Sequence, residues 1–440
     1  MSIGVLARCY HHTSPGGSAL LTKEENELFT RTGPGTPMGA LLRRYWVPAL
    51  LATELPEPDG VPVRVTLLGE ELLAFRDSAG RVGLVDRHCP HRGASLFFGR
   101  NEESGLRCVY HGWKYDVSGQ CVDMPNEPAE SNFKDKIRVT AYPCHERGGV
   151  IWTFMGPAGT APPLPDLEWV IVPDDRRVVS KRIQECNWLQ ALEGGVDLAH
   201  LSFLHRNLDT RHDGKDQELT RTDPSPRFEV VDTDAGLLIA ARRNADAASY
   251  YWRISQFIMP WYTMFPPLID QGMGGHAWVP IDDTSCWAYS ITWNPDAVVS
   301  PEGRDGRPAG KGIYGDLIPG TWRPRANRDN DYLVDRAVQR AVNFTGIPGI
   351  AAQDCAVQES MGVICDRTAE HLGSTDVPLI AVRRRLKTAV DAHEAGREPP
   401  GLEAASQRVR PAALVLPRDI AFQEGAAEAL IARSAMYLSS

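Results

Sequence analysis

The chain has 440 residues, of which 42% are hydrophobic and 23% charged, and its formal net charge at pH 7 is −9. This length allows two or three globular domains, and the acidic balance excludes a protein built mainly to bind nucleic acid, which needs a basic face. No apolar run is long enough to cross a bilayer and the first residues lack a secretory-signal pattern, so we expect a cytoplasmic protein with no membrane partner.

The first third of the chain predicts short helices followed by a small β domain. Helical patterns occupy residues 24–29 and 38–46, separated by the turn signal Gly33-Pro34-Gly35. The pattern then changes to short β-like runs bounded by breakers, at residues 61–68, 71–75, 82–85 and 150–154. A stretch rich in Gly and Pro, residues 156–163, is typical of a linker to the next domain.

Two Cys/His clusters lie inside the predicted β domain. Cys89-Pro90-His91 is separated by sixteen residues from Cys108-Val109-Tyr110-His111. A Rieske [2Fe–2S] cluster needs two thiolates on one iron and two imidazoles on the other, supplied by two loops. We therefore predict that Cys89, His91, Cys108 and His111 bind such a cluster. A zinc site with the same ligands, or a chance arrangement, is the alternative.

The remainder of the chain predicts a second, mixed domain. Residues 252–259 and 286–293 have strand patterns, and residues 331–342 and 383–395 have helical ones. Residues 301–324 are rich in Gly, Pro and charge, which is typical of a surface loop.

A second metal signature begins after a helical stretch at Trp188. Asp197, His200 and His205 are spaced as Asp-x-x-His followed by four residues and His. Two imidazoles and one carboxylate form the facial triad of non-haem iron(II) oxygenases. Five positions on an ideal helix turn side chains by roughly 140°, so the two histidines can share an ion only if the helix bends or breaks, and Gly194 and Gly195 favour such a distortion. Core or surface histidines are the alternative, but a one-electron relay in the same chain favours iron.

The carboxylate of the triad must come from elsewhere in the chain. Asp354 is the best candidate, because it lies in a helical stretch after the breaker at residues 346–349. Glu359 is the runner-up.

These motifs together resemble the α subunits of Rieske non-haem iron aromatic-ring-hydroxylating oxygenases, in the phthalate 4,5-dioxygenase-like branch. The resemblance covers nearly the whole chain, at residues 33–39, 44–46, 89–99, 108–119, 122–125, 134–136, 193–205, 353–354 and 358–360. It implies an α+β protein, with an antiparallel β Rieske domain and a helix-grip catalytic domain. We expect a helical segment at 1–45 that packs on the catalytic domain, the Rieske domain at 46–160, and the mononuclear iron domain with C-terminal helices at 161–440.

The resemblance also implies an assembly. Subunits of such enzymes associate head to tail as homotrimers or stacked homohexamers, and Asp197 would bridge the Rieske cluster of one subunit to the iron of the next. Some relatives carry Asn three residues before this Asp, whereas this chain has Gly194. The loop at 33–39 lacks the G-x-G-x-x-G spacing of a dinucleotide site. Electrons are therefore expected from a separate NAD(P)H-dependent flavin and iron–sulfur reductase that docks near His91 and His111.

The function implied is activation of dioxygen at the mononuclear iron and hydroxylation of a carboxylated, phthalate-like aromatic compound. Two reactions stay open, dioxygenation to a cis-dihydrodiol and O-demethylation of an aryl methyl ether. An alternative of another class is a non-catalytic Rieske electron carrier.

One arginine is a candidate partner for the substrate carboxylate. Arg253 lies in the aromatic, strand-like run at residues 250–257, where a charge is unusual unless it is used. A salt bridge on the outer face of the sheet is an equally good explanation, since alternation does not show which face lines the cavity. Arg242, Arg243 and His276 are the other candidates.

Overall fold

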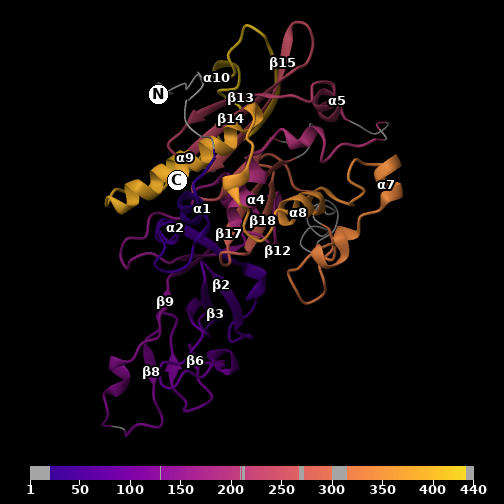
Figure 1. Cartoon of the computed structure of the whole chain (residues 1–440). Helices are drawn as coiled ribbons and strands as arrows, with labels where there is room; N and C mark the ends of the chain where they lie inside the picture. Colours follow the sequence, from indigo (N-terminus) through magenta and orange to yellow (C-terminus); the bar gives the residue numbers. More distant parts are fainter. Residues whose placement is uncertain are drawn as a thin grey trace.

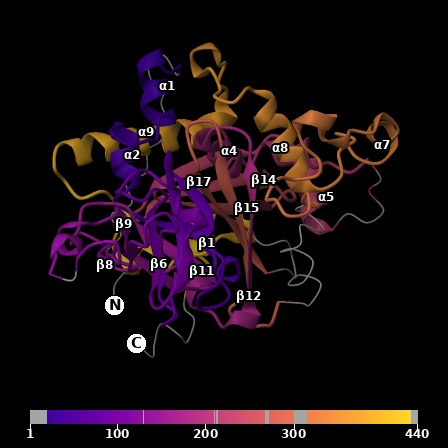
Figure 2. The same cartoon turned by 90° about the horizontal axis from the view of Figure 1, so that it is seen from below.

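The computed structural model describes residues 20–128, 130–208, 210, 214–266, 272–299 and 315–432. Figure 1 shows a slender N-terminal β part, in indigo and purple, below a larger part built around one sheet, and Figure 2 shows the molecule from the side of this β part. Every strand pairing in the described chain is antiparallel, and helices cover the large sheet. The predicted α+β fold class is therefore confirmed.

The first N-terminal helix is present as predicted, and the second is shorter than the sequence pattern suggested. Helix α1 (Lys23–Thr30) begins at a capping box on Thr22, and α2 (Pro37–Leu42) begins with Pro at its first position, where a missing N–H costs nothing. The helical pattern was expected to reach residue 46, but Trp46 instead starts strand β1 (Trp46–Leu51). All six residues of β1 are buried and pair with β11, so tertiary pairing overrides the local pattern.

The β part contains three small sheets. One four-stranded sheet has the order β2-β3-β4-β9, the other has the order β5-β6-β7-β8, and a three-stranded sheet has the order β1-β11-β10. The strands are β2 (Val63–Leu67), β3 (Glu70–Arg76), β4 (Val82–Asp86), β5 (Arg100–Glu102), β6 (Gly105–Arg107), β7 (Lys114–Tyr115), β8 (Cys121–Asp123), β9 (Ala141–Tyr142), β10 (Cys144–Arg147) and β11 (Val150–Phe154).

The large sheet has the order β12-β18-β17-β16-β15-β14-β13, and β19 also pairs with β15. Strand β15 is long enough to pair with β16 near its C-terminal end and with β19 nearer its start. The strands are β12 (Arg177–Gln184), β13 (Arg227–Asp232), β14 (Gly236–Asn244), β15 (Ser249–Ile258), β16 (Tyr262–Phe265), β17 (Met273–Pro280), β18 (Cys286–Trp293) and β19 (Ala412–Pro417).

Three helices position the functional part of this sheet. Helix α4 (Trp188–Val196) packs on β15, β16 and β17, α8 (Ile350–Ser360) packs on α4, and α9 (Val377–Glu394) crosses β13 and β14. The shorter helices are α3 (Glu168–Ile171), α5 (Lys215–Thr222), α7 (Arg336–Ala341) and α10 (Phe422–Gly425).

One sequence expectation in this region needs correction. The single helix expected over 331–342 is divided into a 3-10 segment, Arg328–Leu333, and α7, because three consecutive residues from Asp331 adopt positive φ before Asp335 caps α7. Most of the loop expected at 301–324 lies outside the described residues. Its last part forms a turn closed by a bridge between Leu317 and Pro324.

One continuous core joins the two parts of the molecule. Residues of β1, β2 and β11 pack in the same buried cluster as α4, α9 and the large sheet. A buried ion pair reinforces this junction. Lys181 of β12 is 4% exposed, and its Nζ lies 2.6 Å from Glu54 Oε1 and over the rings of Trp287 and Trp322. No helix in the described part of the chain is long and apolar enough to span a bilayer.

Candidate metal centres

Two loops of the β part bring the four predicted Rieske ligands together. Cys89 and His91 lie between β4 and β5, and Cys108 and His111 lie between β6 and β7. Both thiols are buried, whereas both imidazoles are partly exposed with their ring centroids 4.5 Å apart. The thiolate side of a bound cluster would therefore lie inside the protein and the imidazole side at the surface.

The two loops have the same backbone geometry. In each, the N–H four residues after the cysteine donates to the cysteine carbonyl, from Gly93 at 2.9 Å and from Gly112 at 3.0 Å. Both glycines have positive φ, 75° and 80°, which a side chain would disfavour. The cysteine N–H closes each loop with a 2.8 Å bond, from Cys89 to Ala94 and from Cys108 to Trp113. Such matched loops suit a cluster held from two sides.

Two aromatic residues contact the predicted Rieske ligands. The Tyr115 hydroxyl lies 3.2 Å from Cys89 Sγ, and Trp113 stacks on His91 with the ring centroids 4.2 Å apart. These contacts fix one ligand of each type.

The second set of ligands follows the end of α4. This helix ends at Val196, and His200 lies in the 3-10 segment His200–Ser202. His205 lies in the turn that follows. The helix therefore breaks, as two histidines that bind one ion require, and the break lies before both histidines.

Asp354 of α8 meets the two histidines. Its Oδ1 lies 3.3 Å from His205 Nε2 and 3.7 Å from His200 Nε2. The runner-up, Glu359, points elsewhere, because its carboxylate accepts from the Glu185 N–H and from the Tyr332 hydroxyl. Two imidazoles and one carboxylate at these distances fit a single iron ion with open positions.

The outer nitrogen of each histidine has a partner that orients the ring. Gln353 Nε2 donates to the Ile347 carbonyl at 3.0 Å, so its Oε1 accepts from His205 Nδ1 at 2.8 Å. His200 Nδ1 lies 3.3 Å from Asp197 Oδ2. Both rings therefore present the Nε2 lone pair to the metal. No sequence pattern assigned Gln353 a role, although a metal-binding histidine almost always donates to such an acceptor and Gln353 adjoins Asp354.

Asp197 is the C-cap of α4, and each of its carboxylate oxygens has a partner. Its Oδ1 accepts from the Ala199 N–H at 2.6 Å, and its Oδ2 faces His200. Burial opposes ionisation, but the hydrogen bond and charge of His200 together with the backbone N–H groups of Ala199 and His200 outweigh it, so the pKa of Asp197 lies below its usual value. The side chain is 26% exposed, so a partner molecule can still reach the carboxylate.

The two glycines before Asp197 serve close packing rather than distortion. Both lie inside α4, which stays helical to Val196. A Cβ at position 194 would lie 2.0 Å from Gln358 Nε2, and one at 195 would lie 2.8 Å from Trp278 Nε1. Helix α4 is therefore wedged between α8 and the sheet, and the Gln358 amide fills the space over Gly194.

Strand register identifies the sheet face that α4 covers. Phe257, Thr263, His276 and Ser290 are paired in succession across four strands, so they share a face, and Thr263 is in contact range of position 195. By alternation Arg253 lies on this same inner face. Arg253 is 6% exposed and donates to the Tyr251 hydroxyl at 3.1 Å and to the Pro266 carbonyl at 3.4 Å.

The other candidate anchors have different environments. Burial, with the nearby Arg182 charge, lowers the pKa of His276 to about 3, so this ring is neutral near pH 7. Arg242 lies on the opposite face, with its guanidinium over the Tyr250 ring. Arg243 donates to the Leu198 carbonyl at 2.9 Å and the Ser202 hydroxyl at 3.3 Å, and so supports the segment that carries His200.

Known proteins resemble this chain along most of its length. Residues 45–143 match the model of the Rieske [2Fe-2S] domain, and residues 153–423 match the model described as LigXa C-terminal domain like. The 3-chlorobenzoate-3,4-dioxygenase oxygenase subunit of Comamonas testosteroni is 42% identical over 406 residues, which cover 89% of this chain and 94% of the relative. The phthalate 4,5-dioxygenase oxygenase subunit of Pseudomonas putida is 42% identical over 389 residues, covering 86% and 88%.

A solved structure has a similar fold. Dicamba monooxygenase bound to 3,6-dichlorosalicylic acid superposes with a TM-score of 0.58 and 20% identity, covering 81% of this chain and 99% of that one.

Proposed function

Because the chain belongs to the α subunits of the Rieske aromatic-ring-hydroxylating oxygenases, we propose that it hydroxylates an aromatic compound that carries a carboxylate. It is an enzyme of the dioxygenase and monooxygenase class, with a Rieske [2Fe–2S] cluster and a mononuclear iron as cofactors. The observation that carries the proposal is the convergence of His200, His205 and Asp354 in a chain that also carries the Rieske loops. When bound, the two cofactors supply single electrons and a site for reduction of dioxygen.

The protein's own contribution at the iron is orientation. Gln353 and Asp197 accept from the outer nitrogens of His205 and His200, which leaves both Nε2 atoms to bind metal. The three protein ligands leave positions open for dioxygen beside the substrate. The sheet under α4 supplies a buried wall with Thr263 and Trp278, which supports the helix that leads to the iron ligands.

Electron supply is proposed to cross between subunits. The Rieske loops adjoin β6, at the end of the molecule away from α4 and α8 in Figure 1. In a head-to-tail homotrimer, Asp197 would hold His200 on one side and accept from a Rieske imidazole of the neighbouring subunit on the other. The partly exposed His91 and His111 support this arrangement. A separate NAD(P)H-dependent reductase would deliver the electrons at the same end.

Arg253 is proposed to hold the substrate carboxylate. It lies on the covered face of the sheet, and its Nε has no hydrogen-bond partner among the described residues. A guanidinium can pair with a carboxylate through two parallel bonds. The named substrates of the two relatives at 42% identity, 3-chlorobenzoate and phthalate, both carry this group.

The test is oxygen uptake by the protein with a reductase and NADH, on benzoate, 3-chlorobenzoate, phthalate and methoxybenzoates. We expect uptake with at least one of these carboxylated aromatics, and a cis-dihydrodiol as product. A phenol with formaldehyde would identify an O-demethylase instead. His205→Ala is the matched control, because it should retain the Rieske spectrum and lose uptake. Failure of every carboxylated compound, with active reduction of the cluster, would contradict the proposed substrate class.

A further inference from the structure

The last turn of α4, residues 193–196, is weak as an isolated piece of helix. Two of its four residues are consecutive glycines, and glycine loses more backbone freedom in a helix than other residues do. The chain leaves the helix at Asp197, whose N–H donates to the Glu193 carbonyl at 3.1 Å. Because Asp197 orients His200, the position of this turn has to be fixed by other elements.

Successive positions in this turn face different neighbours, since residues on an α-helix follow one another at about 100°. Position 194 faces Gln358 of α8, and position 195 faces Trp278 of the sheet, each without a side chain of its own. Glu193 points to a third side, toward α9 and the segment that precedes it. It is the one polar side chain with which this turn can hold a neighbour.

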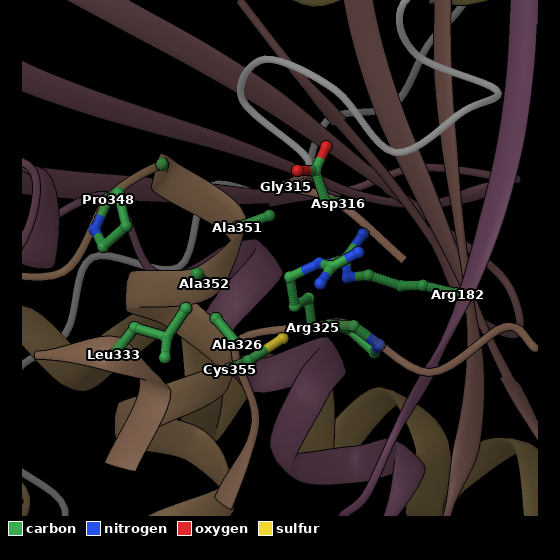
Figure 3. A pocket seen from close by; sticks show the side chains of 12 residues that line it. Arg182, Gly315, Asp316, Arg325, Ala326, Leu333, Pro348, Ala351, Ala352 and Cys355 are labelled. Atoms are coloured by element: carbon green, nitrogen blue, oxygen red, sulfur yellow. The ribbon is translucent and has the colours of Figure 1, made fainter. Parts of the chain in front are cut away.

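Helix α8 alone gives α4 an incomplete support. Part of α8 borders a cavity of about 270 Å³, to whose wall it contributes Ala351, Ala352 and Cys355 (Figure 3). Atoms that line a cavity lack packing partners on that side, so they are constrained less than atoms in a filled core. A fixed point on another face of α4 then contributes more to the position of its last turn.

Glu193 is held by two buried arginines. Arg367 is 0% exposed and donates to the Glu193 carboxylate from Nε at 3.1 Å and from Nη2 at 2.8 Å. Arg383 of α9 is 3% exposed and donates from Nε at 2.6 Å. Burial opposes ionisation of Glu193, but the charges and hydrogen bonds of the two arginines outweigh it, so the pKa of Glu193 lies below its usual value. The carboxylate is therefore charged near pH 7.

A second carboxylate balances the charge of this network. Glu370 accepts from both terminal nitrogens of Arg383, at 2.7 and 2.9 Å, and Asn26 of α1 accepts from Arg367 Nη1 at 3.1 Å. Two carboxylates thus pair with two guanidinium groups, from α4, α9 and the segment between α8 and α9. A buried charge that loses its partner is strongly destabilising, so the loss of one member disturbs the whole group.

We propose that Arg367 and Arg383 are positioning residues of the oxygenase. They hold the last turn of α4 through Glu193, and this turn keeps Asp197 against His200. A displacement at Glu193 reaches Asp197 directly, through the hydrogen bond from the Asp197 N–H. The proposal rests on the proposed function for the role of Asp197 as the bridge between subunits.

The test compares Glu193→Gln with Glu54→Gln in the full-length protein that carries both metal centres. Each substitution changes a carboxylate to an amide in a buried ion pair, but Glu54 pairs with Lys181 of β12 and not with a residue that holds α4. Nitric oxide is added to the ferrous site, and electron paramagnetic resonance then reports the geometry of its ligands. Hydrogen exchange measures how well the amides of residues 194–199 are protected.

We expect Glu193→Gln to shift and broaden the nitrosyl signal and to accelerate exchange of residues 194–199 about tenfold, because the turn opens locally. Glu54→Gln should change neither measurement, even where it lowers the stability of the whole protein. A purely structural role of the arginines would lower stability and leave the nitrosyl signal as it is in wild type.

A milder variant keeps the proposal falsifiable if Glu193→Gln folds poorly. The Glu370 side chain is 19% exposed and contacts Arg383 without touching α4, so Glu370→Gln should produce the same two changes to a smaller extent. An unchanged nitrosyl signal in Glu370→Gln and in any folded Glu193→Gln would overturn the proposal, as would equal changes in Glu54→Gln. Because no turnover is involved, that result would leave the proposed oxygenase function standing, and a lack of oxygen uptake would leave the positioning role standing.

Discussion

At the level of single residues, each iron-binding histidine depends on a neighbour that fixes its ring. Gln353 is such a neighbour for His205, with Oε1 2.8 Å from Nδ1. We predict that Gln353→Leu lowers the affinity for mononuclear iron by about 10- to 100-fold, the usual loss for an outer partner of a metal ligand. Iron binding by equilibrium dialysis measures this, with the Rieske absorption as an internal reference. Gln353→Glu keeps the acceptor and should retain most of the affinity, so equal losses in both variants would contradict this role.

The Rieske ligands and the mononuclear iron ligands lie in different loops, so a substitution can remove one metal centre without the other. We predict that Cys89→Ala and His111→Ala each abolish the Rieske absorption while mononuclear iron still binds at His200 and His205. The reason is that one iron of the cluster loses a required ligand. Absorption spectra and iron content measure the two sites independently. Retention of the spectrum in both variants would show that the cluster is bound elsewhere.

Arg253 gives a prediction about the substrate. We predict that Arg253→Ala weakens the apparent binding of a carboxylated aromatic by about 1.5–3 kcal/mol, the size of a hydrogen bond to a charged group, with both metal centres intact. Steady-state KM values on a carboxylate and on its neutral amide measure the effect. Arg242→Ala is the control, since Arg242 lies on the opposite face over Tyr250. Equal effects on the carboxylate and the amide would indicate a packing role for Arg253.

The Rieske ligands could be predicted from the sequence because the cluster itself requires Cys and His residues at this spacing. Cys89 and His91 are close in the chain, so little folding is needed to bring them together. Gln353 was not identified, because its role depends on a contact between segments far apart in the chain. The face of Arg253 could not be predicted either. It follows from the register of four strands, which no local pattern contains.

At the level of elements, the position of α4 decides where the iron ligands lie. Its two glycines allow it to approach α8 and the sheet closely, and Gln358 lies over Gly194. We predict that Gly194→Ala destabilises the protein by about 1–3 kcal/mol, as overpacking does, and lowers the iron content. Denaturant unfolding and metal analysis measure these two effects. Gly33→Ala, where a Cβ meets nothing within 4 Å, should be close to neutral.

A double variant tests the cause of that loss. Gln358→Ala removes the side chain that a Cβ at 194 would meet, so it should cost less in the Gly194→Ala background than in wild type. Purely additive effects would mean that Gly194 matters for another reason.

Elements were predicted well where burial and local pattern agree. Strand β18 occupies the same residues, 286–293, as the predicted run, since all of it is buried and rich in residues that favour strands. The second predicted helix does not extend to Trp46, because Trp46 pairs with Phe154 and belongs to a strand. The predicted helix at 331–342 failed at Asp331, where positive φ interrupts it. Both helix predictions were wrong because of long-range strand pairing or backbone geometry, and neither can be read from the helical spacing of residues.

At the level of the whole molecule, the separation of the two metal sites needs an explanation. Strands β1, β2 and β11 share one core with the large sheet, which opposes a free swing of the β part, and the Rieske cysteines lie in a second buried cluster with Trp113 and Tyr115. The Rieske loops project at the end away from α4 in Figure 1. Electron transfer within one chain would then cross the body of the protein, whereas a neighbouring subunit could place its imidazoles against Asp197.

This arrangement predicts complementation between two inactive chains. Cys89→Ala removes the cluster from one chain, and Asp354→Ala removes the iron from the other, so each protein alone should lack oxygenase activity. Co-expressed with different tags and purified for both, the mixed oligomer should regain activity, because an intact cluster in one subunit can face an intact iron in the next. Adding Asp197→Ala to the Cys89→Ala chain should abolish the regained activity even when the iron site is fully loaded with added iron, since the bridge belongs to the subunit that holds the iron. Adding Asp197→Ala to the other chain is the matched control and should change nothing. Absence of activity in a mixed oligomer that contains both metal centres would show that electrons travel within a single chain.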